Sequence, residues 1–138
     1  MKRIVKDRGQ SLVEFALALT FLILIVFGVL DLGRAFHILI AITNASREGA
    51  RYLTTHPADK ANEFTGTKEA VVQEAAGSGL AIDPDLVSVT TCSDLDAVEG
   101  CDSGYPVRVA VSHPFDLILG WFWPNAITFT RSTQMVVP

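Results

Sequence analysis

Charge and proline are scarce in the first third of this 138-residue sequence. In the 21 residues from Gln10 to Leu30, Glu14 is the only charged side chain, and the first proline of the chain is Pro57. A helix of 21 residues rises about 31 Å, close to the thickness of the hydrocarbon core of a bilayer. The sequence therefore predicts a membrane-spanning helix with a glutamate near one end.

Catalytic and metal-binding patterns are also missing. The three histidines stand far apart, and there is no H-E-x-x-H, no G-x-S-x-G and no phosphate-binding glycine loop. The acidic segment 93–104 has Val98 where a calcium loop needs an oxygen ligand, so we interpret it as a solvated turn. We predict that the protein is not an enzyme and has no catalytic residue, metal site or cofactor.

The charges divide unevenly along the chain. The first nine residues carry four basic side chains against one acidic, whereas the remainder carries seven basic and fourteen acidic. The positive-inside rule then keeps the N-terminus in the cytoplasm and the C-terminus outside. An acidic exterior argues against nucleic acid as a partner.

Two cysteines, Cys92 and Cys101, lie in the exported part. An oxidising exterior permits a disulfide between them, which would stabilise a small domain by about 2–3 kcal/mol. Two free thiols are the alternative interpretation.

The first helix is expected to continue beyond the membrane, from Ser11 to about Thr54, a length of roughly 65 Å. One face of the upper half of this helix is made of Phe36, Leu39, Ile40, Thr43, Arg47 and Ala50. We expect a partner to cover the apolar part of this face. We divide the chain into a basic leader (1–9), the membrane part of the helix (10–31), its extracytoplasmic continuation (32–56) and a small outer domain (57–138).

The outer domain is predicted to be a short helix and a three-stranded antiparallel sheet, so the fold class is α+β. A loop over Pro57–Gly66 leads to a helix over Lys68–Ala76, with Thr67 near its start as a capping residue. Alternating residues predict three strands. They are Leu86–Cys92, a strand from Val107 that ends before Pro114, and Ala126 to about Val136.

The glutamate in the span calls for a physical reason, because a charge in lipid is costly. Glycine at position 9 stands five residues before it. Cleavage after Gly9 would create an α-amino group on Gln10, which lies at i, i+4 from Glu14 in a helix and could neutralise it. The alternative is a span that starts at Phe15, with Glu14 among the lipid headgroups.

The run Gly-Gln-Ser-Leu-Val-Glu-Phe-Ala from Gly9 resembles the processing site of type IV pilins and pseudopilins. The longer run Arg8 to Leu17, with the segment Ala-Ser-Arg-Glu-Gly-Ala-Arg from Ala45 to Arg51, resembles the TadE-like pseudopilins of tight-adherence (Flp-type) pilus systems. The resemblance extends over about Arg8–Tyr52.

This resemblance implies a minor, accessory structural subunit of the pilus, cleaved after Gly9 by a prepilin peptidase that reads Gly9, Gln10, Glu14 and Phe15. The implied partners are that peptidase, other pilins or pseudopilins, the inner-membrane assembly platform and membrane lipid. The implied location is the inner membrane, with a single pass and the C-terminus outside, or the extracellular pilus after assembly.

The segment Ala45–Arg51 has two interpretations. Ala45 and Gly49 form a small-x-x-x-small pair that permits close approach, and Glu48 can relieve the repulsion between Arg47 and Arg51. These residues either contact a partner pseudopilin during assembly or pack beneath the chain's own sheet.

Two further features have an expected structural role whose contacts the sequence does not identify. Asp31 and Arg34 form an i, i+3 pair at the outer membrane surface, for which we expect a structural role. The apolar stretch Phe115–Trp123 is interpreted as a subunit interface, a membrane-interface anchor or a lid over a small core.

Two other protein classes remain open. An uncleaved single-span protein with an outer binding domain would share the span, the orientation and the cysteines. A soluble domain released by signal peptidase would begin near Gly33 or later, although the sequence there is a poor cleavage site.

Overall fold

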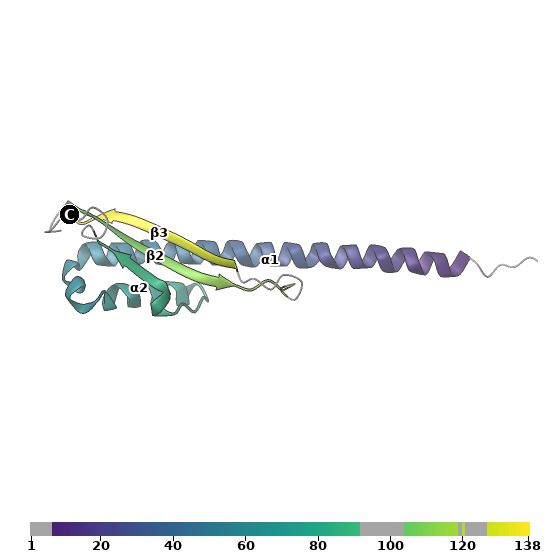
Figure 1. The fold of residues 1–138 in the computed structure, drawn as a ribbon, viewed down its shortest axis with the longest axis horizontal. Helices are drawn as coiled ribbons and strands as arrows, with labels where there is room; N and C mark the ends of the chain where they lie inside the picture. Colours follow the sequence, from purple (N-terminus) through teal and green to yellow (C-terminus); the bar gives the residue numbers. More distant parts are fainter. Residues whose placement is uncertain (1–6, 92–103, 119, 121–126) are drawn as a thin grey trace, which may run out of the picture.

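The computed structural model describes residues 7–91, 104–118, 120 and 127–138. The first helix, α1, spans Asp7–Thr55 and has 49 residues, which corresponds to about 73 Å of length. Its N-terminal half projects alone, and the rest of the fold lies along its C-terminal half (Figure 1). The predicted continuous helix is confirmed, with ends within a few residues of those expected.

A 3₁₀ helix (η1, Pro57–Asn62) and a second α-helix (α2, Thr65–Gly77) follow. α2 begins three residues earlier than predicted, and its N-cap is Phe64 in a left-handed conformation without a side-chain cap bond. The expectation that Thr67 caps the helix was wrong. Thr67 lies inside the first turn, and the first-turn amides are satisfied by Asp59 from η1.

The sheet is antiparallel with the order β1-β2-β3. A short 3₁₀ turn (η2, Pro84–Leu86) leads into β1 (Val87–Thr90), followed by β2 (Pro106–Phe115) and β3 (Ile127–Val136). The predicted α+β class is confirmed: a long helix, a short helix and a three-stranded sheet.

β2 extends beyond its predicted end. Pro114 was expected to stop the strand, but it pairs with Thr128 and the strand continues to Phe115. The pairing with β1 ends at Val111, so no described strand lies beside that edge of β2 at Pro114. The missing N–H of Pro114 therefore costs no hydrogen bond to a described strand.

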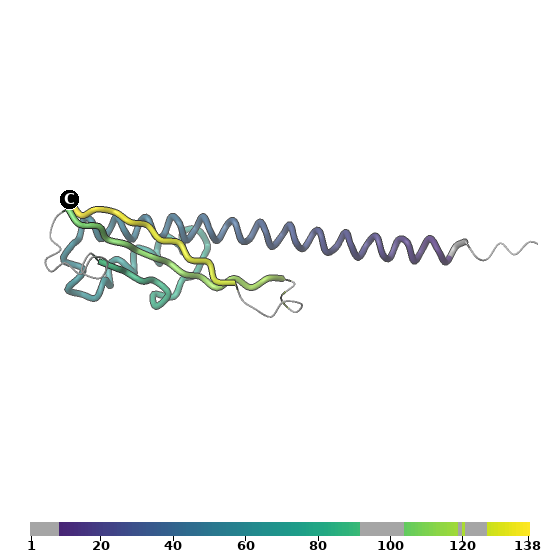
Figure 2. The backbone as a smooth tube through the Cα atoms, turned by 45° about the horizontal axis from the view of Figure 1, so that its top comes forward, coloured from purple at the N-terminus to yellow at the C-terminus, as the bar shows by residue number. Residues whose placement is uncertain are grey.

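The core lies between the C-terminal half of α1, the inner face of the sheet and one face of α2. Figures 1 and 2 show the sheet and α2 running along the same half of α1. Ile42 from α1, Val71 from α2, and Val109 and Val111 from β2 are completely buried. Each such side chain contributes about 1.5–3 kcal/mol of hydrophobic stabilisation, so the sheet and α2 depend on α1 for their core.

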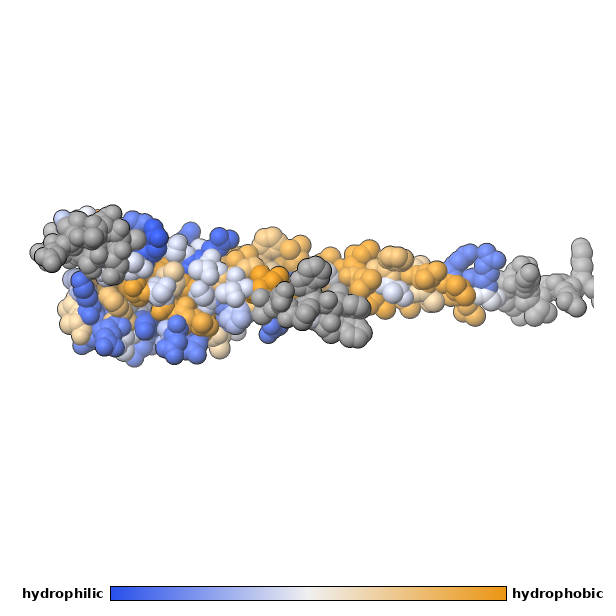
Figure 3. Space-filling view, viewed as in Figure 1, coloured by the Kyte–Doolittle hydropathy of each residue, from blue (hydrophilic) through white to orange (hydrophobic). Residues whose placement is uncertain are grey.

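The projecting half of α1 is apolar on its surface. Its large side chains from Leu12 to Leu30 are mostly exposed, and Figure 3 shows a hydrophobic surface along this part of the helix. The helix is long and apolar enough to cross a membrane, a property that signal sequences share.

Candidate functional site on the long helix

The predicted processing residues lie in the first turns of α1 and are exposed. The side-chain amide of Gln10 donates to a carboxylate oxygen of Glu14 at 3.2 Å. A Cβ added at Gly9 would meet no atom within 4 Å, and Phe15 is exposed one residue after Glu14. The segment is therefore open to an approaching protein, and the side chains at i and i+4 already touch.

The small pair of the segment Ala45–Arg51 lies inside the chain's own core. Ala45 is completely buried. A Cβ at Gly49 would collide with Cγ2 of Val71 and lie 3.2 Å from Cγ1 of Val109. Of the two interpretations, packing beneath its own sheet and helix is the one that the geometry shows for this pair.

The opposite side of α1 is uncovered. Phe36 and Ile40 expose 58% and 61% of their surface, whereas Ala50 at the end of the predicted face is completely buried. The side of α1 that the chain's own sheet and α2 cover contains Ile38, Ile42 and Ala45. That a partner covers the apolar part of the predicted face stays a prediction.

A groove of about 320 Å³ lies along this uncovered side, between α1 and β3. Its lining includes the apolar side chains of Phe36, Leu39 and Ile40 and the guanidinium-bearing residues Arg47 and Arg131. Neither arginine is in an ion pair with a described residue. The groove thus combines apolar side chains with two arginines that have no ion-pair partner among the described residues.

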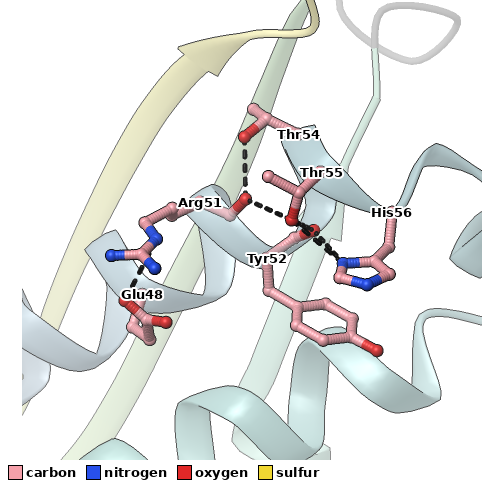
Figure 4. Close-up of polar contacts among 6 residues, drawn as sticks. All are labelled: Glu48, Arg51, Tyr52, Thr54, Thr55 and His56. Atoms are coloured by element: carbon pink, nitrogen blue, oxygen red, sulfur yellow. Dashed lines mark hydrogen bonds and ion pairs between the residues drawn. The ribbon is translucent and has the colours of Figure 1, made fainter.

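Side chains of the last turn cap the C-terminal end of α1 (Figure 4). The hydroxyls of Thr54 and Thr55 donate to carbonyls of the last turn, and the rings of Tyr52 and His56 stack with centroids 4.3 Å apart. Arg51 and Glu48 approach to 3.9 Å on the exposed side, as their i, i+3 spacing predicted. A pair this exposed contributes little to stability.

The N-terminal part of the chain matches a known family. The family model for TadE-like proteins aligns with residues 9–51. Over this segment the chain resembles TadE-like proteins. The match covers the predicted processing residues, the apolar run and the segment Ala45–Arg51, and it ends before α2 and the sheet. No curated protein and no solved structure gave a significant match.

The TadE-like segment contains a carboxylate that binds a distant part of the chain. Asp31 is buried, with 6% of its surface exposed, and both of its oxygens accept from the backbone N–H of Ile118, at 3.1 and 3.0 Å. Arg34 donates to Asp31 at 2.9 Å and to the carbonyl of Asp116 at 3.3 Å, and its guanidinium lies 5.2 Å from the ring centroid of Phe115. The predicted i, i+3 pair is present and also holds the end of β2 on α1.

Outside the TadE-like segment, Asp59 forms the most connected polar site. It accepts from the N–H of Gly66 at 3.1 Å and from both the N–H and the hydroxyl of Thr67, at 2.7 and 2.6 Å. Burial raises the pKa of Asp59, but the Thr67 hydroxyl, the two N–H groups and the nearby His56 outweigh it, and the pKa lies below 3.8. Asp59 therefore joins η1 to α2 as a carboxylate.

No group of three His, Cys, Asp or Glu side chains suited to a metal ion occurs among the described residues. A groove of about 410 Å³ between α1 and α2 is lined in part by Glu48, Glu69 and Glu74. His113 on β2 has a buried Nδ1 without a hydrogen bond in the described part of the chain. None of these features forms a recognisable catalytic arrangement.

Some predictions fall on residues outside the described ranges. These are the disulfide between Cys92 and Cys101, the acidic segment 93–103 and most of the apolar stretch beyond Ile118. The first six residues of the basic leader lie outside as well.

Sequence reasoning missed Asp59 and the partner of Asp31. Both carboxylates bind backbone N–H groups, which leave no mark in a sequence. For Asp59, a usable signal was the pair Gly66 and Thr67. Such residues often begin a helix, and the first amides of a helix need an acceptor. For Ile118, 87 residues from Asp31, no local signal exists.

Proposed function

We propose that this chain is a minor pseudopilin, an accessory structural subunit in the assembly of an Flp-type (tight-adherence) pilus. The TadE-like segment supports an association with that pilus system. The proposal adds processing after Gly9 by a prepilin peptidase and assembly with other pilins or pseudopilins on an inner-membrane platform. The protein's role is structural, without a catalytic site or cofactor.

The observation that carries the proposal is the arrangement of Gly9, Gln10 and Glu14. Gly9 is uncovered, and Gln10 already contacts Glu14 across one helical turn. Cleavage after Gly9 would place a positive α-amino group on Gln10, beside that carboxylate. The two charges would offset each other's cost in lipid, within one chain or between neighbouring chains.

The proposed membrane placement follows from the same helix. Residues 1–9 form the cytoplasmic leader, and residues 10–31 span the inner membrane. The continuation 32–56 and the domain 57–138 lie outside. The basic leader supports this orientation, and the exposed apolar surface of the lower half of α1 supports contact with lipid.

Assembly would use the uncovered side of α1. The small pair Ala45 and Gly49 is occupied by the chain's own α2 and β2, whereas Phe36, Ile40 and Arg47 remain accessible. Arg51 is exposed beyond them. Other pilin helices would therefore pack along the groove between α1 and β3. This groove lies above the apolar surface of α1 that faces lipid before assembly.

The deciding experiment is the intact mass and N-terminal sequence of the membrane-extracted protein, made with and without its prepilin peptidase. Two variants sharpen it: Gly9→Leu, and Gly28→Leu as a matched control, since both glycines lie on α1 with open space around them. We expect a peptidase-dependent start at Gln10 in the wild type and in Gly28→Leu, and a start at Met1 in Gly9→Leu.

A start at Met1 in all samples would contradict the proposal and favour an uncleaved single-span protein with an outer binding domain. A peptidase-independent start near Gly33 would favour a secreted domain instead.

A further inference from the structure

The end of β2 is tied to α1 at one level of the long helix. The carboxylate of Asp31 accepts twice from the N–H of Ile118, and Arg34 bridges that carboxylate to the carbonyl of Asp116. The guanidinium of Arg34 also lies over the ring of Phe115. Asp116 and Ile118, just after the end of β2 at Phe115, are thus held to one helical turn by charge-assisted hydrogen bonds, which are the stronger kind.

The tie, meaning the bonds of Asp31 and Arg34 to Asp116 and Ile118, lies at the same height on α1 as the outer end of the proposed span. From Gln10 to Asp31 the helix rises about 31 Å, which is close to the thickness of the hydrocarbon core. Since the N–H of Ile118 lies within hydrogen-bond distance of Asp31, Ile118 occupies the same height along α1. The residues tied to Asp31 would therefore lie at the outer boundary of the lipid.

The side chains at this level are apolar and exposed. Ile118 exposes 45% of its surface, and Leu30 and Leu32, on either side of Asp31, are also exposed. Phe27, one turn below Asp31 on the same helical face, is half-buried, whereas Phe21 exposes 67%. The covered face of α1 therefore begins below Asp31, inside the proposed span. Among the charged side chains at this level, Asp31 and Arg34 form an ion pair, whereas the carboxylate of Asp116 is exposed.

We propose that the segment Phe115–Ile118 is a lipid-contacting foot of the outer domain. Ile118 inserts into the headgroup–acyl boundary beside α1, and the Asp31–Arg34 pair fixes its height. The occupant of this surface is the lipid bilayer, because the exposed Leu30, Leu32 and Ile118 lie where the apolar surface of the proposed span ends. The exposed carboxylate of Asp116 would lie among the lipid headgroups. The inference rests on the membrane placement within the proposed function, and it adds a second contact that orients the outer domain on the membrane.

The test is photo-crosslinking of the full-length protein in vesicles of phosphatidylethanolamine and phosphatidylglycerol. p-Benzoylphenylalanine replaces Ile118, or Leu22 as a position inside the span, or Leu86 as an exposed apolar residue of the outer domain. Adducts are identified by mass spectrometry. We expect lipid adducts from positions 22 and 118 and none from position 86.

A lipid adduct at position 22 together with no lipid adduct at position 118 would overturn the inference and leave the proposed membrane placement intact. An absence of lipid adducts at position 22 would overturn both. The two failures are therefore distinguishable.

A second set of variants tests the tie itself. Asp31→Ala removes the acceptor for Ile118, whereas Asp116→Ala removes a neighbouring exposed carboxylate and leaves the carbonyl that Arg34 uses. We expect the lipid adduct at position 118 to fall several-fold in Asp31→Ala and to be unchanged in Asp116→Ala, with adducts at position 22 constant in both. An equal yield in the two variants would contradict the role of Asp31.

Discussion

Thr67 donates twice to the same oxygen of Asp59, from its backbone N–H at 2.7 Å and from its hydroxyl at 2.6 Å. Gly66 donates to the other oxygen. One buried carboxylate therefore satisfies the first amides of α2 from outside the helix, at the position where an N-cap side chain is missing. Asp59 therefore links η1 to α2, together with the bond from the Thr65 hydroxyl to the carbonyl of Asn62.

We expect Asp59→Ala to destabilise the outer domain by about 2–4 kcal/mol, because buried N–H groups and a hydroxyl lose a charged acceptor. Thr67→Val removes only one donor and should cost about 1 kcal/mol. Thermal unfolding of the full chain in detergent, followed by circular dichroism, measures both. A control is Asp85→Ala, an exposed carboxylate near η2. Equal unfolding temperatures for the Asp59 and Asp85 variants would contradict the role of Asp59.

The same carboxylate predicts an acid dependence. Because the pKa of Asp59 is lowered in the folded state, its contribution to stability is present above its ordinary pKa of 3.8. That contribution is lost as the pH falls through the lower, folded-state pKa. Asp59→Asn should therefore remove part of the loss of stability below pH 3.8. Parallel stability–pH curves for the variant and the wild type would argue against this assignment.

Gly49 should not tolerate a side chain. Alanine there would press its Cβ into Val71 and against Val109, and such overpacking costs about 1–3 kcal/mol. Gly33→Ala is the matched control, because the space around that helical glycine is open and alanine favours helix by about 1 kcal/mol. Denaturant unfolding should separate the two variants in opposite directions. Partial recovery in Gly49→Ala with Val71→Ala would identify the contact responsible.

The groove on the uncovered side of α1 should matter for assembly and not for folding. Ile40→Glu changes an exposed side chain, so we expect an unfolding temperature within error of the wild type. If other helices pack there, the charge should reduce pilus formation and co-purification of other subunits by about tenfold or more. Leu86→Glu, another exposed apolar position, serves as the control. Unchanged piliation in Ile40→Glu would place the assembly surface elsewhere.

Glu14 is expected to act in assembly more than in cleavage. Glu14→Ala removes the carboxylate that the side chain of Gln10 contacts and that a new α-amino group would face. Cleavage, followed by intact mass, should persist, whereas piliation, followed by counting surface filaments, should fall strongly. Ser11→Ala provides a small neighbouring change for comparison. Normal piliation in Glu14→Ala would defeat the charge argument.

The sequence predicted the elements more successfully than their contacts. The absence of proline before Pro57 and the alternation from Val107 to Val111 each determined an element with little ambiguity. Which face of α1 is covered could not be derived, since Phe36 and Ile40 are as apolar as the buried Ile38 and Ile42. The choice depends on where β2 and α2 pack, which is a tertiary property.

The contacts of the candidate site also differ in whether the sequence indicates them. The bond from the side-chain amide of Gln10 to Glu14 is compatible with their i, i+4 spacing, whereas the predicted contact of a new α-amino group with Glu14 stays a prediction. The bond from Ile118 to Asp31 joins residues 87 apart, through a backbone N–H that every residue except proline possesses. Side-chain identity therefore carries no information about such a partner.

The unbroken α1 has a mechanical consequence. Its 49 residues run without a proline or a kinking element from one end of the molecule to the other. Because an unbroken helix is stiff along its axis, a displacement of its first turn, at Gln10, is transmitted to the turn that carries Thr55. In the proposed membrane placement, a machine that acts only on the N-terminal end of α1 would thereby move the sheet on the other side of the membrane.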